Sequence, residues 1–258
     1  MKINDKNNTL TFFKKITGTT IADLAGLNKF KPKGDCVLAM LGYVTEPFDE
    51  FYTKRGDIAE KLAFKSLTKK GHKCVTYDKK QYHYDNFPEN PYFGGLIDIE
   101  IPSEKTLYEI KSKNIKDYEK ISKFGDVVQE EQAMHYAFLR GYKEAHIMWI
   151  FFDDTTEEEI RSDKPISTYK NLKMFEKTLP IDFDYQDKLH KDALLYYVHC
   201  LAHQQVPIED VSDKYLELLK VKRPNSNPKT DSSSPKTSDL QNGKSTQIQL
   251  NLFDEVAK

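Results

Sequence analysis

The chain has 258 residues, of which 38% are hydrophobic, which is enough for one domain with a sizeable core or for one domain and a tail. No apolar run reaches the length of a membrane span, and three scattered cysteines (Cys36, Cys74 and Cys200) argue against a disulfide framework and a four-cysteine metal site. The net charge is −1, but residues 1–80 hold 16 Lys and Arg against 9 Asp and Glu, which fits either a phosphate-facing surface or ordinary solvated helix faces.

The N-terminal part is predicted to contain two helices and a strand, followed by an irregular segment. The opening MKINDKNNTL has no apolar signal core, so we expect a cytoplasmic protein. Apolar spacing predicts, in chain order, a helix within 17–30, a helix over 49–70 and a strand over 72–78. Pro88 and Pro91 interrupt the aromatic stretch 81–93, which predicts a loop or an irregular sheet edge.

The remainder alternates strands with helices and ends in a polar tract. Strands are expected over 95–101, 105–112, 145–153 and 173–181, and helices over 126–141, 184–204 and 208–221. The run 145–153 is mostly apolar, which suits a strand buried on both faces. We therefore expect an α/β domain with a central mixed β-sheet flanked by helices. Residues 223–246 are rich in Ser, Pro, Asn and Lys, so we expect a disordered C-terminal linker there.

Charged side chains occur at regular spacing in the two strands predicted at 95–101 and 105–112. Because side chains alternate between the faces of a strand, Glu109 and Lys111 share one face, and Asp98 projects from the polar face of the preceding strand. Two carboxylates brought close repel each other, so they need a cation between them or a raised pKa. Mg²⁺ prefers oxygen ligands, and an adjacent amine can position a water or neutralise a phosphate. This set of groups suits phosphodiester hydrolysis.

Spacing alone leaves other interpretations open for these strands. A hairpin with exposed salt-bridging residues, such as Glu109 with Lys111, has the same pattern. Glu100 shares the predicted face of Asp98, so Glu100 is a competing ligand candidate of lower rank.

Several motifs resemble a known nuclease core. GGLIDIE and EIK supply Asp98 and then Glu109, Ile110 and Lys111, with ten residues between Asp98 and Glu109. This arrangement resembles the core of the PD-(D/E)XK nuclease superfamily, which implies a restriction-endonuclease-like fold.

Two helical motifs resemble the RecB-like branch of that superfamily. RGDIAEKLAF has Gly56 four residues before Glu60, as for that branch's helical glutamate. QAMHY has Gln132 and Tyr136 on one helix face, as in that branch's Gln–Tyr motif. Further upstream, TGTTIADLAGLNKFKPKGD resembles the opening of YqaJ and lambda-exonuclease-like recombinases. The resemblance covers residues 16–152.

The resemblance implies a role for each matched residue. Asp98 and Glu109 would ligate Mg²⁺, for which Mn²⁺ is expected to substitute, with the carbonyl of Ile110 as a further ligand. Glu60 would ligate the metal directly or through water, and Lys111 would orient the attacking water. Gln132 and Tyr136 would support Lys111 or bind phosphate. The candidates for DNA-phosphate contacts, each equally well explained as solvated surface, are Thr19, Thr20, Lys29, Lys31 and Arg55.

Two other groups of side chains have a functional and a structural interpretation. The aromatic residues of 81–93 could stack on unpaired bases, but packing over the sheet edge is favoured. His199 and His203 share a helix face, which is a pattern found in zinc sites, but no third ligand lies at a helpful offset. We therefore expect no zinc site there.

Apolar residues return after the polar tract, in TQIQLNLFDEVAK. The pentapeptide QLNLF (249–253) resembles the motif by which bacterial replication and repair proteins bind the sliding clamp. Gln249 would form a hydrogen bond, and Leu252 and Phe253, with Leu250 before them, would supply the apolar contacts. A terminal strand packed on the protein's own surface is the alternative. The expected organisation is a nuclease domain over 1–222, a linker over 223–246 and a binding motif over 247–258.

The resulting prediction is a Mg²⁺-dependent DNA exonuclease of phage or bacterial recombination or repair. Its expected partners are DNA, the sliding clamp and a single-strand annealing protein, and some lambda-like relatives imply a homo-oligomer. The alternatives are an endonuclease or structure-specific nuclease on the same core, and a catalytically idle DNA- or clamp-binding adaptor.

Overall fold

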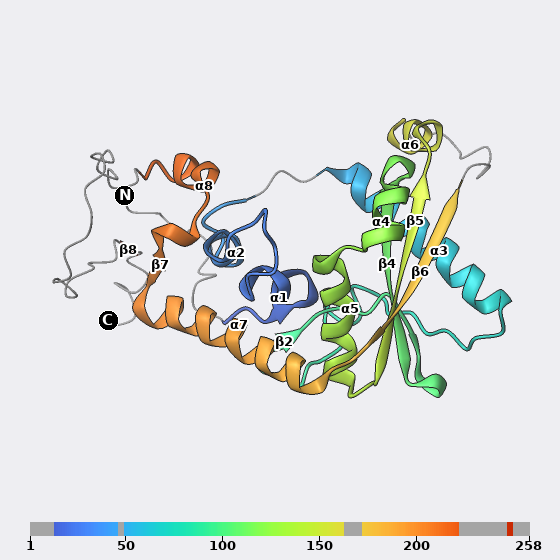
Figure 1. The fold of residues 1–258 in the computed structure, drawn as a ribbon, viewed down its shortest axis with the longest axis horizontal. Helices are drawn as coiled ribbons and strands as arrows, with labels where there is room; N and C mark the ends of the chain where they lie inside the picture. Colours follow the sequence, from blue (N-terminus) through green and yellow to red (C-terminus); the bar gives the residue numbers. More distant parts are fainter. Residues whose placement is uncertain (1–12, 46–48, 163–171, 222–246, 250–258) are drawn as a thin grey trace, which may run out of the picture.

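The computed structural model describes residues 13–45, 49–162 and 172–221, together with the backbone of residues 247–249. Its centre is a mixed four-stranded sheet in which one parallel strand pair lies between two antiparallel pairs (Figure 1). The strands follow in spatial order as β3 (Ile99–Ile101), β4 (Thr106–Asn114), β5 (Glu144–Phe152) and β6 (Lys173–Pro180). The predicted α/β class with a central mixed sheet is confirmed.

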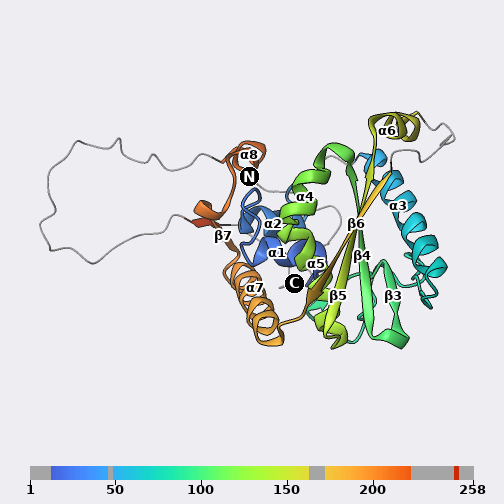
Figure 2. The same ribbon diagram turned by 45° about the vertical axis from the view of Figure 1, so that its right-hand side comes forward.

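Helices cover both faces of this sheet (Figure 2). α3 (Glu50–Lys69) packs small and aliphatic side chains on one face, and α5 (Val127–Arg140) packs on the other. Side chains of β5 alternate between the two cores, with Met148 on the α3 side and Trp149 on the α5 side. The expectation that residues 145–153 form a strand buried on both faces is therefore correct.

A further group of helices packs on the side of α5 away from the sheet (Figure 1). It consists of α1 (Gly18–Leu24), α2 (Lys33–Met40), α7 (Phe183–His203) and α8 (Asp213–Leu218). These helices share a core that includes Tyr197 and Tyr215. β1 (Ile16–Thr17) leads into α1 and pairs in parallel with β2 (Phe93–Gly94). This pairing connects the N-terminal helices to the segment that precedes β3.

Short elements complete the described chain. They are α4 (Tyr118–Phe124), α6 (Asp154–Arg161), three 3₁₀ turns (Pro102–Glu104, Ile115–Asp117 and Ile208–Asp210), and the antiparallel pair of β7 (Gln205–Pro207) with β8 (Gln247–Gln249). None of the helices in the described ranges is both long and apolar enough to cross a membrane. The three cysteines are free thiols, as their scattered positions predicted.

Local sequence explains where the long helices begin and end. Asp49, Asp126 and Asp182 are the N-cap residues of α3, α5 and α7, and each carboxylate accepts a hydrogen bond from a backbone N–H of the first turn. Gly141 ends α5 with a φ of 69°, a left-handed conformation that glycine adopts without steric cost. These caps fix the α5 helix, which supplies two of the candidate site residues.

Two predicted strands are shorter than expected. The strand predicted over 72–78 is reduced to a single bridge between Val75 and Glu100. The strand predicted over 95–101 is regular only from Ile99, because Gly95 has a φ of 125° and the chain bends before it joins β4. Asp98 therefore lies just outside the paired part of the hairpin rather than within it.

The helix boundaries also differ from the sequence-based expectation. The helix predicted within 17–30 ends at Leu24, since Gly26 takes a φ of 75°. α2, α4 and α6 were not predicted as separate helices, and the segment predicted over 208–221 is a 3₁₀ turn followed by α8. The aromatic stretch 81–93 is irregular, as predicted. The predicted linker over 223–246 lies outside the described residues.

Candidate active site

The β3–β4 hairpin and α5 bring the predicted catalytic side chains together. Glu109 and Lys111 lie on the face of β4 that packs against α5, where the Lys111 Nζ donates hydrogen bonds to Glu109 Oε1 (2.7 Å) and Gln132 Oε1 (2.8 Å). The backbone N–H of Ile110 donates to Asp98 Oδ2 at 2.8 Å. β4 thus holds the Lys111 amine through the Glu109 side chain, and it holds the Asp98 carboxylate through the backbone N–H of Ile110.

The protonation equilibria of this cluster reflect burial and mutual repulsion. Burial raises the pKa of Glu109, whose side chain is almost completely enclosed, and burial together with the Glu109 charge raises the pKa of Asp98. Burial lowers the pKa of Lys111, but the Glu109 and Asp98 carboxylates outweigh burial and raise it. The amine is therefore held as an ammonium ion, and the two carboxylates are left with an unfavourable interaction that a further cation would relieve.

Glu60 approaches the same cluster from α3. Burial, followed by the Asp98 charge, raises the pKa of Glu60 to about 7. Its carboxylate lies 3.4 Å from the Lys79 Nζ, which also pairs with Asp57 at 3.0 Å. The Asp98 charge therefore acts on Glu60. The cation paired with Glu60 is Lys79, from the irregular segment before the hairpin.

The donor set fits a hard divalent cation. Glu109 Oε2 is buried and has no hydrogen-bond partner among the described residues, although carboxylate oxygens in such positions are normally satisfied. Within those residues, no three His, Cys, Asp or Glu side chains form a preformed metal cage. Mg²⁺ commonly uses one or two protein carboxylates and keeps several waters, so Asp98 and Glu109 suffice for it. The predicted metal roles of Glu60 and the Ile110 carbonyl remain predictions.

Two glycines that the sequence analysis did not single out shape this site. A Cβ atom added to Gly18 would lie 2.6 Å from Gln132 Cγ and 2.7 Å from Tyr136 Cζ, and one added to Gly95 would lie 2.6 Å from the Tyr136 hydroxyl. Tyr136 is 2% exposed, so it supports the site from beneath and does not present its ring to solvent. The only sequence signal for this contact was Gly18 itself, directly before the threonines of α1.

Glu100 belongs to a separate cluster. Its buried carboxylate accepts hydrogen bonds from the Tyr77 hydroxyl, from Tyr142 (2.6 Å) and from Arg140 (3.2 Å). Glu100 lies opposite Leu107 in the hairpin and therefore on the α5 side of the sheet, but it faces the C-terminal end of α5. The competing interpretation of Glu100 as a metal ligand is not supported, because its oxygens are already satisfied by these donors.

The predicted DNA-contact residues have different surroundings. Thr19 is exposed and Thr20 accepts a hydrogen bond from the Thr17 backbone at 2.8 Å, so both lie at the N-terminus of α1 beside the site. Lys29 is exposed in the loop after α1, and Lys31 pairs with Asp23 at 3.3 Å. These four positions remain compatible with phosphate contacts.

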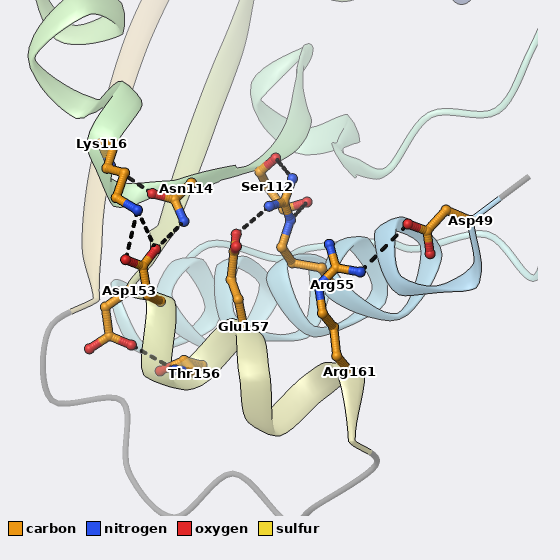
Figure 3. A network of polar contacts seen from close by, with 10 residues as sticks. Asp49, Arg55, Ser112, Asn114, Lys116, Asp153, Thr156, Glu157 and Arg161 are labelled. Atoms are coloured by element: carbon orange, nitrogen blue, oxygen red, sulfur yellow. Dashed lines mark hydrogen bonds and ion pairs between the residues drawn. The ribbon is translucent and has the colours of Figure 1, made fainter.

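Arg55 is the exception, because it is only 7% exposed. It donates to the Ser112 hydroxyl (3.2 Å) and carbonyl (3.0 Å) and forms an ion pair with Glu157 (Figure 3). The prediction of a phosphate contact by Arg55 is therefore corrected: its guanidinium connects α3 to the end of β4 and to α6. Sequence spacing did not reveal this, because α6 was not predicted.

Two of the five aromatic side chains in 81–93 are packed, as favoured from the sequence. Phe87 stacks on Tyr136 with 6.1 Å between ring centroids, and Phe93 packs edge-on against His190 at 4.8 Å. The other three, Tyr82, Tyr84 and Tyr92, are 40%, 62% and 48% exposed. The rings of His199 and His203 lie 4.3 Å apart without a third metal-ligating group in the described part of the chain, so the zinc interpretation gains no support.

The C-terminal motif is only partly described. The backbone of Gln249 pairs with Gln205, as the last residue of β8. This pairing agrees with the alternative interpretation, in which the terminal strand packs on the protein's own surface. Leu250, Leu252 and Phe253 lie outside the described residues, and clamp binding stays a prediction.

Comparisons with known proteins address the fold. No protein-family model matches the chain. Uncharacterized proteins of Mycoplasma pneumoniae and Mycoplasma genitalium are each 34% identical to it over 89 residues, which are 34% of this chain and 32% of each relative. The match therefore spans about a third of the length of those curated relatives.

Three solved structures share the fold. A phage-related exonuclease from Haemophilus somnus 129PT is 17% identical, with 75% of this chain and 98% of that chain covered and a TM-score of 0.52. An alkaline exonuclease from Laribacter hongkongensis is 15% identical, with coverage of 82% and 94% and a TM-score of 0.52. A structure of LHK-Exo in complex with dAMP is 14% identical, with coverage of 76% and 92% and a TM-score of 0.53. The chain therefore has the fold of these exonuclease structures.

Proposed function

We propose that the chain is a Mg²⁺-dependent deoxyribonuclease that acts as an exonuclease on linear DNA. The observation that carries the proposal is the cluster of Asp98, Glu109 and Lys111, in which a buried carboxylate oxygen with no hydrogen-bond partner in the described part of the chain lies beside an ammonium ion held by Gln132. The shared fold with exonucleases from two bacterial sources supports the same reaction class. The complex of one of them with dAMP supports a nucleotide as the ligand.

Each side chain has a physical role in this proposal. Asp98 and Glu109 would hold the metal ion, which when bound supplies an acidified water and neutralises charge on the phosphate. Lys111 stays protonated and donates hydrogen bonds, so it orients the attacking water and stabilises negative charge as it develops on the phosphate. Gln132 fixes the position of the Lys111 amine, and Tyr136 supports Gln132 from the core. Water exclusion by the surrounding core strengthens each of these interactions.

Digestion of linear and covalently closed circular DNA tests the proposal. In the presence of Mg²⁺, linear DNA should be degraded to nucleotides, closed circles should persist, and EDTA should stop the reaction. Lys111→Met should lower kcat roughly 10²–10⁴-fold, because it removes a positioned donor from the transition state. Nicking of closed circles would instead identify an endonuclease, and intact linear DNA with normal DNA binding would identify an idle adaptor. End-labelled substrates would then report polarity.

The cellular setting is a further part of the proposal. The N-terminal segment resembles phage-type recombinases, which favours recombination or repair in a bacterial cytoplasm and a single-strand annealing protein as a partner. The QLNLF pentapeptide supports recruitment by a sliding clamp. A clamp pull-down with the full chain tests that recruitment independently of the cleavage assay.

A further inference from the structure

The loop between α1 and α2, residues 25–32, presents one aromatic ring to solvent. Phe30 is 97% exposed, more than any other large apolar side chain in the described part of the protein. Single exposed apolar side chains are common on protein surfaces and by themselves indicate nothing. Two features distinguish Phe30 from an incidental surface residue. Hydrogen bonds hold the loop that carries it, and lysines flank it in the sequence.

The backbone that carries Phe30 is held by a buried carboxylate. Asp23 is 3% exposed, and its oxygens accept a hydrogen bond from the Asn28 amide at 2.8 Å and pair with the Lys31 amine at 3.3 Å. The Asn28 side-chain oxygen in turn accepts a hydrogen bond from the Phe30 N–H at 3.0 Å. The ring is therefore displayed from a fixed loop, so little conformational entropy is lost when it binds a partner.

Positively charged residues flank Phe30 in the sequence. The stretch GLNKFKPKG (26–34) contains three lysines and no acidic residue, and the nearest acids on either side, Asp23 and Asp35, are buried. Lys33 extends over the Tyr196 ring, with its Nζ 5.3 Å from the centroid. An aromatic ring with a lysine on either side in the sequence matches a nucleic-acid strand, in which a flat base alternates with a phosphate. It matches the core of a protein–protein interface less well, because lysine is depleted there.

The position of the loop relative to the candidate active site fits the same partner. α1 begins at Gly18, which touches Gln132 and Tyr136, and the loop leaves from its other end. The seven residues of α1 span about 10 Å at 1.5 Å per residue. Successive phosphates of one strand are separated by about 3.4 Å along a duplex axis, so the length of α1 corresponds to about three nucleotides of a strand.

We propose that Phe30 stacks on an unpaired base of the DNA bound at the candidate active site, while Lys29 and Lys31 contact the flanking phosphates. This inference rests on the proposed nuclease function and adds a substrate feature to it, namely frayed or single-stranded nucleotides beside the scissile position. The Phe30 ring supplies the part of the affinity that depends on an accessible base, and the lysines supply the part that depends on salt.

Fluorescence anisotropy with two labelled DNAs tests the proposal, with the full chain in Ca²⁺ so that binding is measured while gels monitor cleavage. One DNA carries a single-stranded extension, and the other is a blunt duplex with the same number of phosphates. Phe30→Ala should weaken binding of the extended DNA about tenfold and of the duplex by less. Lys29→Ala should weaken both and reduce the salt slope by about one. Leu195→Ala, which removes a side chain that is 67% exposed on α7, is the matched control and should change neither.

Phe30→Trp supplies a direct signal. The natural chain has one tryptophan, Trp149, which is fully buried, so the new indole would dominate the change of emission on binding. Quenching by the extended DNA and retained affinity support stacking.

Unchanged affinity of Phe30→Ala, equal losses on both DNAs, or an emission of Phe30→Trp that DNA does not alter would each overturn the inference. A change of molecular mass in solution for Phe30→Ala would also overturn it, since the ring would then join copies of the chain. The proposed function is judged separately: wild-type protein that binds DNA through Phe30 but leaves linear DNA intact with Mg²⁺ would contradict the nuclease and preserve the stacking.

Discussion

At the scale of single residues, the candidate site contains an interaction that opposes folding. Burial raises the pKa of both Asp98 and Glu109, and the Glu109 charge raises the pKa of Asp98 further. Removing one carboxylate should therefore stabilise the metal-free chain while it removes activity, as is common where a functional site holds like charges.

Asp98→Asn is predicted to raise the melting temperature in EDTA and to abolish cleavage. Asparagine can still accept the hydrogen bond from the Ile110 N–H, but its side chain no longer repels Glu109. A stabilisation of about 1 kcal/mol would correspond to roughly 2–4 °C for a chain of this size. Differential scanning calorimetry with and without Mg²⁺ measures both effects, since Mg²⁺ should stabilise the wild type only. Glu89→Gln, at an exposed position in the segment before the hairpin, is the control, and a lowered melting temperature of Asp98→Asn would contradict the repulsion.

Two buried histidines make a second residue-scale prediction, for acid stability. His135 Nδ1 lies 2.8 Å from His190 Nε2, and His190 Nδ1 lies 2.7 Å from the Gln186 carbonyl, whereas His135 Nε2 is 3.2 Å from the Gly94 carbonyl. Two neutral rings carry two protons, and these satisfy the two shorter contacts if both rings are protonated at Nδ1. Burial lowers the pKa of His135 to about 3 and that of His190 to about 4, so both rings stay neutral in the folded protein.

The unfolded chain should take up protons on these rings near pH 6.5, and the folded chain should not. Their contribution to stability is therefore complete above about pH 6.5 and is lost as the pH falls toward the folded pKa values. We expect the two histidines to contribute roughly 4 kcal/mol less to the free energy of unfolding in urea at pH 5 than at pH 7.5. The raised pKa values of Glu60 and Asp98 act in the opposite direction over this range, so the histidine part is read from the difference between wild type and variant. His190→Gln should reduce this pH dependence by about half, while His203→Gln at the exposed end of α7 should leave it unchanged. An equally steep dependence in His190→Gln would exclude the pair as its source.

At the scale of elements, Arg55 joins three segments that the sequence does not place together. Its guanidinium bonds to Ser112 at the end of β4 and to Glu157 of α6, and Arg161 of α6 pairs with Asp49 at the start of α3 at 3.6 Å (Figure 3). α6 itself packs little apolar surface, since Ile160 is the only apolar residue of this helix. The polar network therefore contributes much of what holds α6 against α3.

Arg55→Met is predicted to destabilise the protein by roughly 3 kcal/mol, because Glu157 would be left without its buried partner. The double variant with Glu157→Gln should recover part of the loss, which a double-mutant cycle in urea would measure. DNA affinity and its salt dependence should remain at the wild-type values when measured well below the melting temperature. A reduced salt slope in Arg55→Met would restore the original expectation of a phosphate contact.

The same elements show what could be predicted from the sequence. Glu109 and Lys111 were placed correctly because β4 is a long regular strand, in which alternation alone decides the face. Strand alternation does not explain the position of Asp98. The chain turns at Gly95, and the Ile110 N–H donates a hydrogen bond to the Asp98 carboxylate. Glu100 is held by Arg140 and Tyr142, and Arg55 is paired with Glu157. These partners are distant in sequence. No local periodicity contains such pairings, so the sequence alone could not show that Glu100 and Arg55 form structural contacts.

At the scale of the whole molecule, the C-terminal motif offers a test of recruitment. Replacing Gln249, Leu252 and Phe253 with Ala should abolish capture of the full chain by an immobilised sliding clamp and leave the cleavage of free DNA unchanged. The tether of about 25 residues would otherwise raise the local concentration of the nuclease at the clamp. Gln247→Ala with Ile248→Ala is the comparison, because these residues pair through their backbones with β7. Unaltered capture of the triple variant would discard the clamp motif.

The contact of Gly18 with Gln132 and Tyr136 has a consequence for the order in which the protein loses activity on heating. The N-terminal helices share their core with α7 and α8 but not with the sheet, so we expect this half to loosen at a lower temperature than the sheet. Such loosening would move the Gly18 backbone away from Gln132 and Tyr136. Gln132 would then no longer fix the position of the Lys111 amine. Catalysis should then fade at a lower temperature than the circular dichroism of the strands, and the gap between the two would widen in variants that weaken the helical half.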